Sequence, residues 1–179
     1  TIINQTLSVY FRTTYNVEEI TKLTSAIISA DYDDGFIAYL NGNEVARSYN
    51  LPEPGTFVPF DFATYYDHEA SLYNGGLPES IIIDSLSLDS ILIDGPNVFA
   101  VQLHNVSTSS SDLSGNFYLT FGISDDSQFY SEPPSWFLEP VIYDQSHLPI
   151  IMIDTYGADI PDEPRISAYM GIINNESGT

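Results

Sequence analysis

The sequence predicts an all-β protein, an antiparallel β-sandwich of the jelly-roll type with a C-terminal extension. Apolar and polar residues alternate with a period of two, which is the period of a half-buried strand. The alternating segments are short, rich in β-branched and aromatic residues, and bounded by turn residues. No helix-length segment separates successive strands, which favours a sandwich over a parallel α/β sheet.

Seven strands are predicted before residue 125, at residues 7–17, 25–33, 36–42, 43–48, 80–88, 97–106 and 115–123. Asn41-Gly42 predicts a tight hairpin turn between the third and the fourth of them. Only residues 17–23 have the mixed polarity of a short helix, and that helix would be barely two turns long. Helix is therefore expected to be a minor component.

The longest irregular segment is the loop of residues 49–79, which exceeds the ~12 to 15 residues beyond which a structureless loop is usually functional or mobile. Several of its aromatic residues stand directly beside polar ones, so apolar faces and hydroxyl-bonding groups occur together, as sugars require. The predicted ligand-binding residues are Tyr65, Tyr66, Asp67, His68 and Tyr73. The alternative is that these rings only cap one end of the sandwich.

A proline-containing segment follows the last predicted strand of the sandwich. Residues 125–147 have the composition of a linker, so the sandwich module is expected to comprise residues 1–124. Residues 148–179 predict two further strands, which cannot form a stable domain by themselves. They either pack on the sandwich or begin a further domain.

Charge limits the partners of the chain. The formal charge is −21, from 25 acidic residues against four lysines and arginines, which opposes binding to nucleic acid or to an anionic membrane. No apolar run approaches the ~18 residues that cross a bilayer, so no membrane insertion is expected. A saline setting or bound divalent cations would relieve the self-repulsion, and a secreted or cell-surface location is expected. The sequence contains no cysteine, which excludes disulfides and thiol chemistry.

The acidic turn Asp33-Asp34-Gly35 has two interpretations. In the first, Gly35 supplies a positive φ and the aspartates cap backbone amides, so the motif only joins two strands. In the second, hard carboxylates from several loops bind a structural calcium ion, the one cofactor expected for this chain. The predicted metal ligands are Asp31, Asp33, Asp34 and Asp112.

Alternation also sorts the strand at residues 97–106 into two faces. Phe99 and Val101 lie on the more apolar face, which is expected to be the core. Gln102 and His104 lie on the opposite face, where His104 either contacts a sugar hydroxyl or a loop carbonyl, or makes a structural hydrogen bond.

No catalytic residue is predicted. The chain has no phosphate-cradling glycine loop and no Gly-x-Ser-x-Gly elbow near its histidines. A pair of carboxylates for glycoside hydrolysis is not excluded, because their separation is visible only in three dimensions. The chain is therefore expected not to be an enzyme.

Three segments carry a resemblance to a known family: "VYFRTTYNV" (9–17), "DDGFIAYLNGNEVARS" (33–48) and "GPNVFAVQLHNVSTSSSDLS" (95–114). Together they resemble a galactose-binding-like jelly-roll module, an accessory domain of large secreted bacterial proteins. The tail at residues 148–175 resembles the segment that opens the spore-coat H-type (CotH-like) kinase-related region. The resemblance implies a noncatalytic sandwich module associated with carbohydrate, with neighbouring domains in the parent chain.

The leading hypothesis from the sequence is a secreted, noncatalytic module that binds a neutral polysaccharide through the aromatic residues of the 49–79 loop. The charge of −21 is expected to repel sulfated or uronic polymers, which favours neutral ones. The alternative is a structural or adhesive spacer without affinity for glycans. Solvent-facing rings in one plane favour the first hypothesis, and rings packed inward favour the second.

Overall fold

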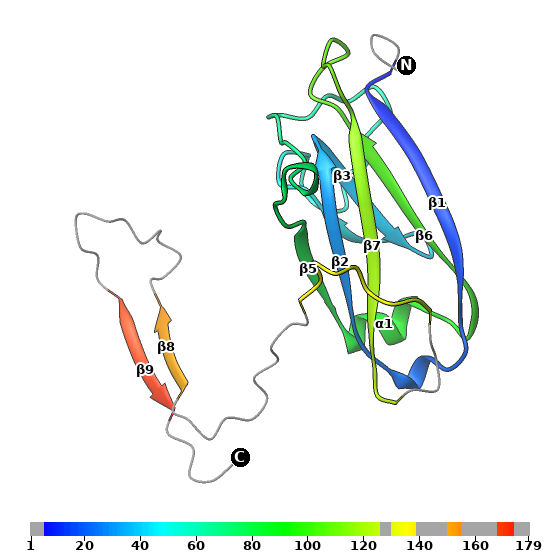
Figure 1. Cartoon of the computed structure of the whole chain (residues 1–179), viewed down its shortest axis with the longest axis vertical. Helices are drawn as coiled ribbons and strands as arrows, with labels where there is room; N and C mark the ends of the chain where they lie inside the picture. Colours follow the sequence, from blue (N-terminus) through cyan, green and yellow to red (C-terminus); the bar gives the residue numbers. More distant parts are fainter. Residues whose placement is uncertain (1–5, 126–129, 139–149, 155–167, 174–179) are drawn as a thin grey trace. The chain divides into compact units, whose positions relative to one another are not determined.

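The computed structural model describes residues 6–125, 130–138, 150–154 and 168–173 (Figure 1). The chain divides into two compact units, Thr1–Trp136 and Phe137–Thr179. The dividing point falls inside the segment of residues 125–147 that the sequence predicts as a linker. Each unit is described below by itself.

The first unit is a sandwich of two antiparallel sheets (Figure 1). The first sheet has the strand order β1 (Ser8–Val17), β6 (Gly95–His104), β3 (Gly35–Leu40) and β4 (Asn43–Arg47). The second sheet has the order β5 (Glu79–Asp84), β2 (Leu23–Asp33) and β7 (Ser114–Ile123). The predicted all-β sandwich is confirmed, and each predicted strand has a counterpart.

Two expectations about helices need correction. The strand predicted at residues 80–88 ends at Asp84, and α1 (Ser85–Ile91) follows it. The alternation of leucine and serine fits both the period of a strand and that of a helix. Leu88 and Leu92 are four residues apart, which places them on one face of a helix, and both are buried. The helix therefore packs these leucines better than a strand would. Of the helix considered at residues 17–23, only the 3-10 turn η1 (Ile20–Lys22) forms, between the end of β1 and the start of β2. Within the described residues, no helix is long and apolar enough to span a membrane.

The hairpin predicted at Asn41-Gly42 is present between β3 and β4. Both residues have positive φ, 48° and 84°, as a tight hairpin turn requires. The expectation for Gly35 was wrong, because the positive-φ glycines do not include it. Space explains this glycine instead: a Cβ at Gly35 would lie 2.7 Å from Thr64 Cγ2 and 3.0 Å from Asn50 Oδ1.

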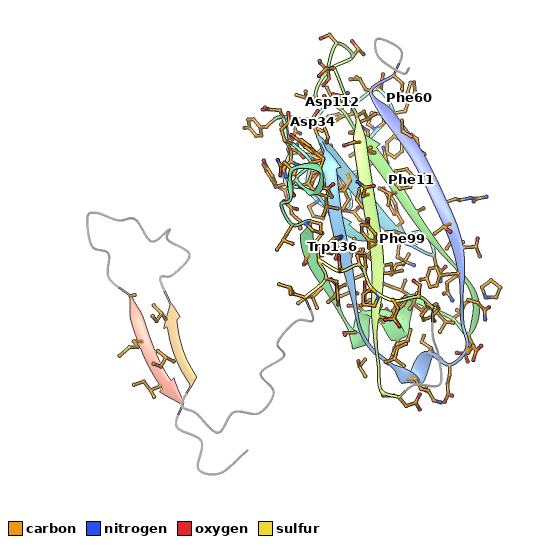
Figure 2. All side chains as sticks on the ribbon, viewed as in Figure 1. Phe11, Asp34, Phe60, Phe99, Asp112 and Trp136 are labelled. Carbon is orange, nitrogen blue, oxygen red and sulfur yellow. The ribbon has the colours of Figure 1, made fainter. Side chains whose placement is uncertain are left out.

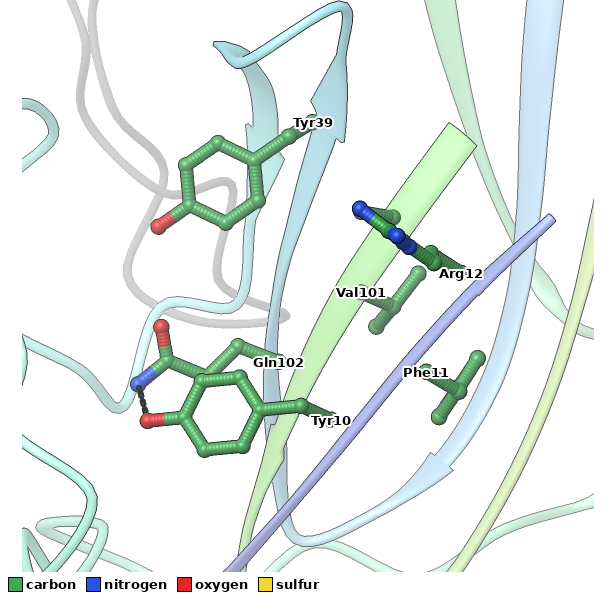
Figure 3. Close-up of a pocket in the computed structure, with 7 residues that line it drawn as sticks. Tyr10, Phe11, Arg12, Tyr39, Val101 and Gln102 are labelled. Carbon is green, nitrogen blue, oxygen red and sulfur yellow. Dashed lines mark hydrogen bonds between the residues drawn. The ribbon is translucent and has the colours of Figure 1, made fainter. Parts of the chain in front are cut away.

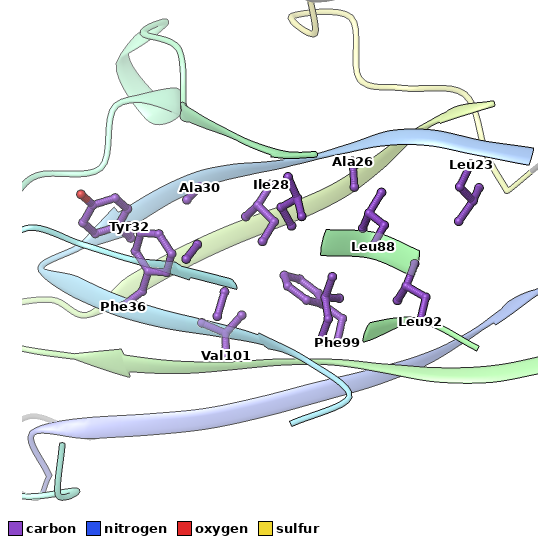
Figure 4. Close-up of a cluster of buried hydrophobic side chains, with 14 of the residues drawn as sticks. Leu23, Ala26, Ile28, Ala30, Tyr32, Phe36, Leu88, Leu92, Phe99 and Val101 are labelled. Atoms are coloured by element: carbon purple, nitrogen blue, oxygen red, sulfur yellow. The ribbon is translucent and has the colours of Figure 1, made fainter. Parts of the chain in front are cut away.

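The core lies between the two sheets (Figure 4). Phe99 and Val101 of β6 face Ile28 and Tyr32 of β2, and Leu88 of α1 closes one end. Each such side chain stabilises the fold by about 1.5–3 kcal/mol when it is fully buried. The face of β6 that alternation assigned to the core is confirmed.

The 49–79 loop packs on the outer face of the first sheet. Leu51 and Val58 of this loop form a second, smaller buried cluster with Ile37 of β3. Apart from the 3-10 turn η2 (Leu72–Asn74), residues 48–78 have no regular secondary structure, as predicted. The loop is nevertheless fixed by its own hydrogen bonds, because the Asn50 side chain donates to the Tyr66 carbonyl at 2.7 Å.

The second unit contains a two-stranded antiparallel sheet of β8 (Ile150–Asp154) and β9 (Tyr169–Ile173). The two late strands predicted from the sequence are therefore present, and they pair with each other. Most of the predicted linker and of the tail resemblance lies outside the described residues. In the first unit, Trp136 packs edge-on against Tyr118 of β7, with ring centroids 4.9 Å apart.

Candidate functional site

A groove of about 550 Å³ lies on the outer face of the first sheet (Figure 3). Strand register explains which side chains meet there: Tyr10 pairs with Gln102 across β1 and β6, and Tyr39 of β3 pairs with Ala100. Alternation turns these side chains away from the core. The lining residues of this face are Tyr10, Arg12, Tyr39, Ala100 and Gln102, and Phe11 and Val101, whose side chains lie on the inner face of the sheet, complete the lining.

The two tyrosines flank the central strand of the groove. Tyr10 projects from β1 and Tyr39 from β3, on either side of β6, and Figure 3 shows the flat faces of both rings. The small side chain of Ala100 leaves the floor between them open. Tyr10 is 57 % exposed, so its ring face is available to a ligand.

A buried hydrogen-bond network fixes the position of the Tyr10 ring. The Gln102 amide nitrogen lies 2.9 Å from Tyr10 Oη, 2.9 Å from the Val58 carbonyl oxygen and 2.6 Å from His104 Nε2. Gln102 is thus held by a loop carbonyl on one side and by His104 on the other. The amide nitrogen has two protons for these three acceptors, and its contact with the Tyr10 hydroxyl restrains the ring.

His104 lies beneath this network and is fully buried. An amide nitrogen only donates, so His104 Nε2 accepts, and the ring proton resides on Nδ1, which donates to the Phe62 carbonyl at 2.8 Å. Burial lowers the pKa of His104; the bond to Phe62 acts in the opposite sense, and Arg47 reinforces the lowering. The contact with a loop carbonyl that the sequence analysis considered is present, and it is a buried structural hydrogen bond.

The charged and phenolic groups of the groove are hydrogen-bond donors. Burial, and then Glu44, raise the pKa of Tyr39, so its hydroxyl keeps its proton at neutral pH. Arg12 is exposed, and no acidic partner is found for it among the described residues. By contrast, Lys22 pairs with Glu19 and Arg47 pairs with Glu44.

The rings predicted in the 49–79 loop are exposed. Tyr65, Tyr66 and Tyr73 are 56 %, 64 % and 77 % accessible, and Asp67 is exposed as well. Tyr65 packs edge-on against Phe62, with ring centroids 5.5 Å apart. No ring contact joins the three tyrosines to one another within the part of the chain that the structure describes.

His68, the fifth predicted ligand-binding residue, is held by the protein itself. Its ring stacks on Tyr32, with centroids 4.1 Å apart, and its Nδ1 lies 3.0 Å from the Tyr32 carbonyl oxygen. Its backbone N–H donates to Asp34 at 2.8 Å. These contacts fix the position of the loop and leave only part of the ring edge exposed.

The four aspartates predicted as metal ligands separate into two pairs. Asp31 accepts from the backbone N–H of Ser71 at 2.6 Å and from that of Leu72 at 3.0 Å. Burial acts to raise the pKa of Asp31, but these N–H bonds outweigh it and the pKa is lowered. Asp34 accepts from the backbone N–H of His68 and from that of Val106 at 2.7 Å. Both carboxylates therefore tie loops to the sandwich.

Asp33 and Asp112 are brought together with a third acid, Glu69, at the end of the sandwich where Figure 2 labels Asp34 and Asp112. One carboxylate oxygen of each residue lies within 4.8 Å of the other two. Burial, followed by the charges of Asp34 and Asp112, raises the pKa of Asp33 to about 7. The sequence analysis missed Glu69, because nothing in the sequence indicates that the loop returns to the end of β2.

Tyr10, Arg12 and Tyr39 were not predicted as site residues from the sequence. The available signal was their position on the face of each strand opposite the core. What the sequence does not state is that β1 and β3 both lie next to β6, which brings these side chains together.

Comparisons with known proteins give little further guidance. No family model matches the chain, and no curated protein matches it. One solved structure with some similarity is the α-L-rhamnosidase of Streptomyces avermitilis complexed with L-rhamnose, with 18 % identity and a TM-score of 0.36. The match covers 80 % of this chain and 13 % of the rhamnosidase chain. Such a similarity does not assign a function, and the CotH-like resemblance of the tail has no support in these comparisons.

Proposed function

We propose that this chain is a noncatalytic carbohydrate-binding module that holds a neutral polysaccharide in the groove on the outer face of the first sheet. The observation that carries the proposal is the pair Tyr10 and Tyr39, which flank an open floor while Gln102 fixes the Tyr10 hydroxyl. Flat aromatic faces beside hydrogen-bond donors suit sugars, whose rings have an apolar face and polar edges.

The composition of the groove supports binding without catalysis. None of the seven residues that line it carries a carboxylate, whereas glycoside hydrolysis commonly uses two on either side of the scissile bond. Arg12 offers several N–H donors that sugar hydroxyls can accept. The module is proposed to act outside the cell, as part of a larger secreted or surface protein.

The structure favours the groove over the loop tyrosines as the primary site. In the groove, strand register brings the rings and donors onto one surface, and the Gln102 network restrains Tyr10. The loop tyrosines are exposed, but no contact joins them into one platform within the described residues. Tyr65, Tyr66 and Tyr73 are therefore proposed to extend the binding surface at most.

Affinity electrophoresis of the full chain tests the proposal with a panel of glucans, mannans, xylans and galactans. Few stacked rings bind weakly, so dissociation constants on the order of micromolar to millimolar are expected. Tyr10→Ala should abolish retardation while melting like the parent, because Tyr10 is largely exposed. Tyr73→Ala removes a more exposed ring outside the groove and should keep most of the retardation.

Three outcomes would contradict the proposal. Loss of retardation in Tyr73→Ala alone would indicate that the binding site is the 49–79 loop and not the groove. Stronger retardation on polygalacturonate than on every neutral polymer, abolished by Arg12→Gln, would replace the neutral ligand with an acidic one. No retardation on any polymer would leave the structural or adhesive spacer as the better hypothesis.

A further inference from the structure

Three carboxylates from separate segments converge at one end of the sandwich. Asp33 ends β2, Glu69 belongs to the 49–79 loop, and Asp112 belongs to the loop between β6 and β7. One oxygen of each lies within 4.8 Å of the other two. Like charges at this distance repel each other, and a bound cation would offset this repulsion.

Asp33 is the one buried member of this cluster, and the described residues offer its carboxylate no partner. It is only 4 % exposed, yet no hydrogen bond to its carboxylate is found among the described residues. Its neighbours differ, since Asp31 and Asp34 each accept two backbone N–H groups. Buried carboxylates are normally hydrogen-bonded, paired with a cation or bound to a metal.

Asp34 places the two loops that carry the other two acids. One of its oxygens accepts from the backbone N–H of His68, the residue before Glu69. The other accepts from the backbone N–H of Val106, at the start of the loop that carries Asp112. Glu69 and Asp112 are thus held near Asp33 by hydrogen bonds that involve none of the three carboxylates, which is the organisation of a built site.

We infer that Asp33, Glu69 and Asp112 bind a calcium ion. The donors are hard carboxylate oxygens, with no histidine or cysteine in the cluster, and calcium accepts six to eight such oxygens in flexible geometry. Three carboxylates supply three to six of them, and water supplies the rest. Magnesium requires a nearly ideal octahedron of short bonds, which exposed acids on two loops do not impose. Asp31 and Asp34, predicted as ligands from the sequence, serve instead to position the loops.

The test uses the full chain and calcium alone, at constant ionic strength, with isothermal titration and thermal melting in calcium or in chelator. Calcium should bind and raise the melting temperature of the parent. Glu69→Gln and Asp112→Asn change exposed residues and should weaken calcium binding at least tenfold. Asp67→Asn is the matched control, because it removes one exposed charge two residues before Glu69 in the sequence, and its affinity should stay within twofold of the parent's.

For Asp33→Asn, the order of the melting temperatures of variant and parent should reverse between chelator and calcium. A purely structural role for the carboxylate does not predict this reversal. In chelator this variant should melt at or above the parent, because an uncompensated buried charge is gone. In calcium the variant should melt below the parent, because it lacks one ligand and is not stabilised by the ion.

The inference is overturned by any of three results. The first is the absence of binding and of a melting shift at millimolar calcium. The second is an equal loss of affinity in Asp67→Asn and in Asp112→Asn, which would indicate diffuse screening. The third is an equal melting shift with magnesium at the same concentration.

Discussion

The groove and the acidic end of the sandwich differ in how their side chains are positioned. In the groove, Tyr10, Tyr39 and Ala100 stand on paired strands, so the backbone ladder alone brings them together. At the acidic end, loops must be brought to the end of β2, and the buried carboxylates of Asp31 and Asp34 do this through backbone N–H groups. Substitutions in the groove should therefore change binding with little effect on folding, whereas substitutions at the acidic end should first change stability.

The largest effect on stability is expected for Asp34→Ala. The change leaves the backbone N–H groups of His68 and Val106 without acceptors, at about 1–3 kcal/mol for each buried group left unsatisfied. The free energy of unfolding should fall by about 2–6 kcal/mol, measured with urea in the presence of chelator.

Asp61→Ala is the control for this comparison, because Asp61 is an exposed acid of the same loop. Its unfolding free energy should stay within about 0.5 kcal/mol of the parent's. Equal losses in the two variants would show that the acidic end is not held by Asp34.

A smaller, pH-dependent effect is expected from His104, which lies beneath the groove. Because burial lowers its pKa in the folded state, the unfolded chain binds more protons once the pH falls below the ordinary value of about 6.5. The contribution of the neutral ring to stability is therefore complete above that value and decreases as the pH falls toward the folded-state pKa.

Urea unfolding at about pH 7 and about pH 5 measures this contribution. The carboxylates also titrate in this range, so the comparison is with His104→Gln, which keeps a polar side chain but cannot be protonated. The parent should lose more stability on acidification than the variant does. Parallel losses would mean that His104 is not held in its neutral form.

The sequence predicts strands better than it predicts the positions of loops. Alternation identified the buried face of β6, and the Asn41-Gly42 pair identified the hairpin, because both signals depend only on neighbouring residues. Alternation failed at α1, where Leu88 and the alternating serines fit two periods and tertiary packing selects the helix. The positive φ predicted for Gly35 was also wrong, because this glycine is required by the approach of Thr64, a residue 29 positions away along the printed sequence.

The candidate site shows the same limit. The alternation of β6 predicts that Gln102 and His104 face away from the core. It does not predict that Tyr10 and Tyr39 flank this strand, because that depends on which strands become neighbours. The sequence identified Asp33 and Asp112 as metal-ligand candidates, but it could not identify Glu69, because its position depends on the hydrogen bonds of Asp34 to two loops.

The most direct test of the proposed function fills the floor of the groove. Ala100→Leu should place a larger side chain between Tyr10 and Tyr39, while Val98→Leu enlarges a side chain on the same face of β6 outside the groove. On a neutral polysaccharide that retards the parent, Ala100→Leu should bind at least about tenfold more weakly, and Val98→Leu should bind as the parent does. Undiminished binding by a folded Ala100→Leu variant would contradict the assignment of the groove as the binding site.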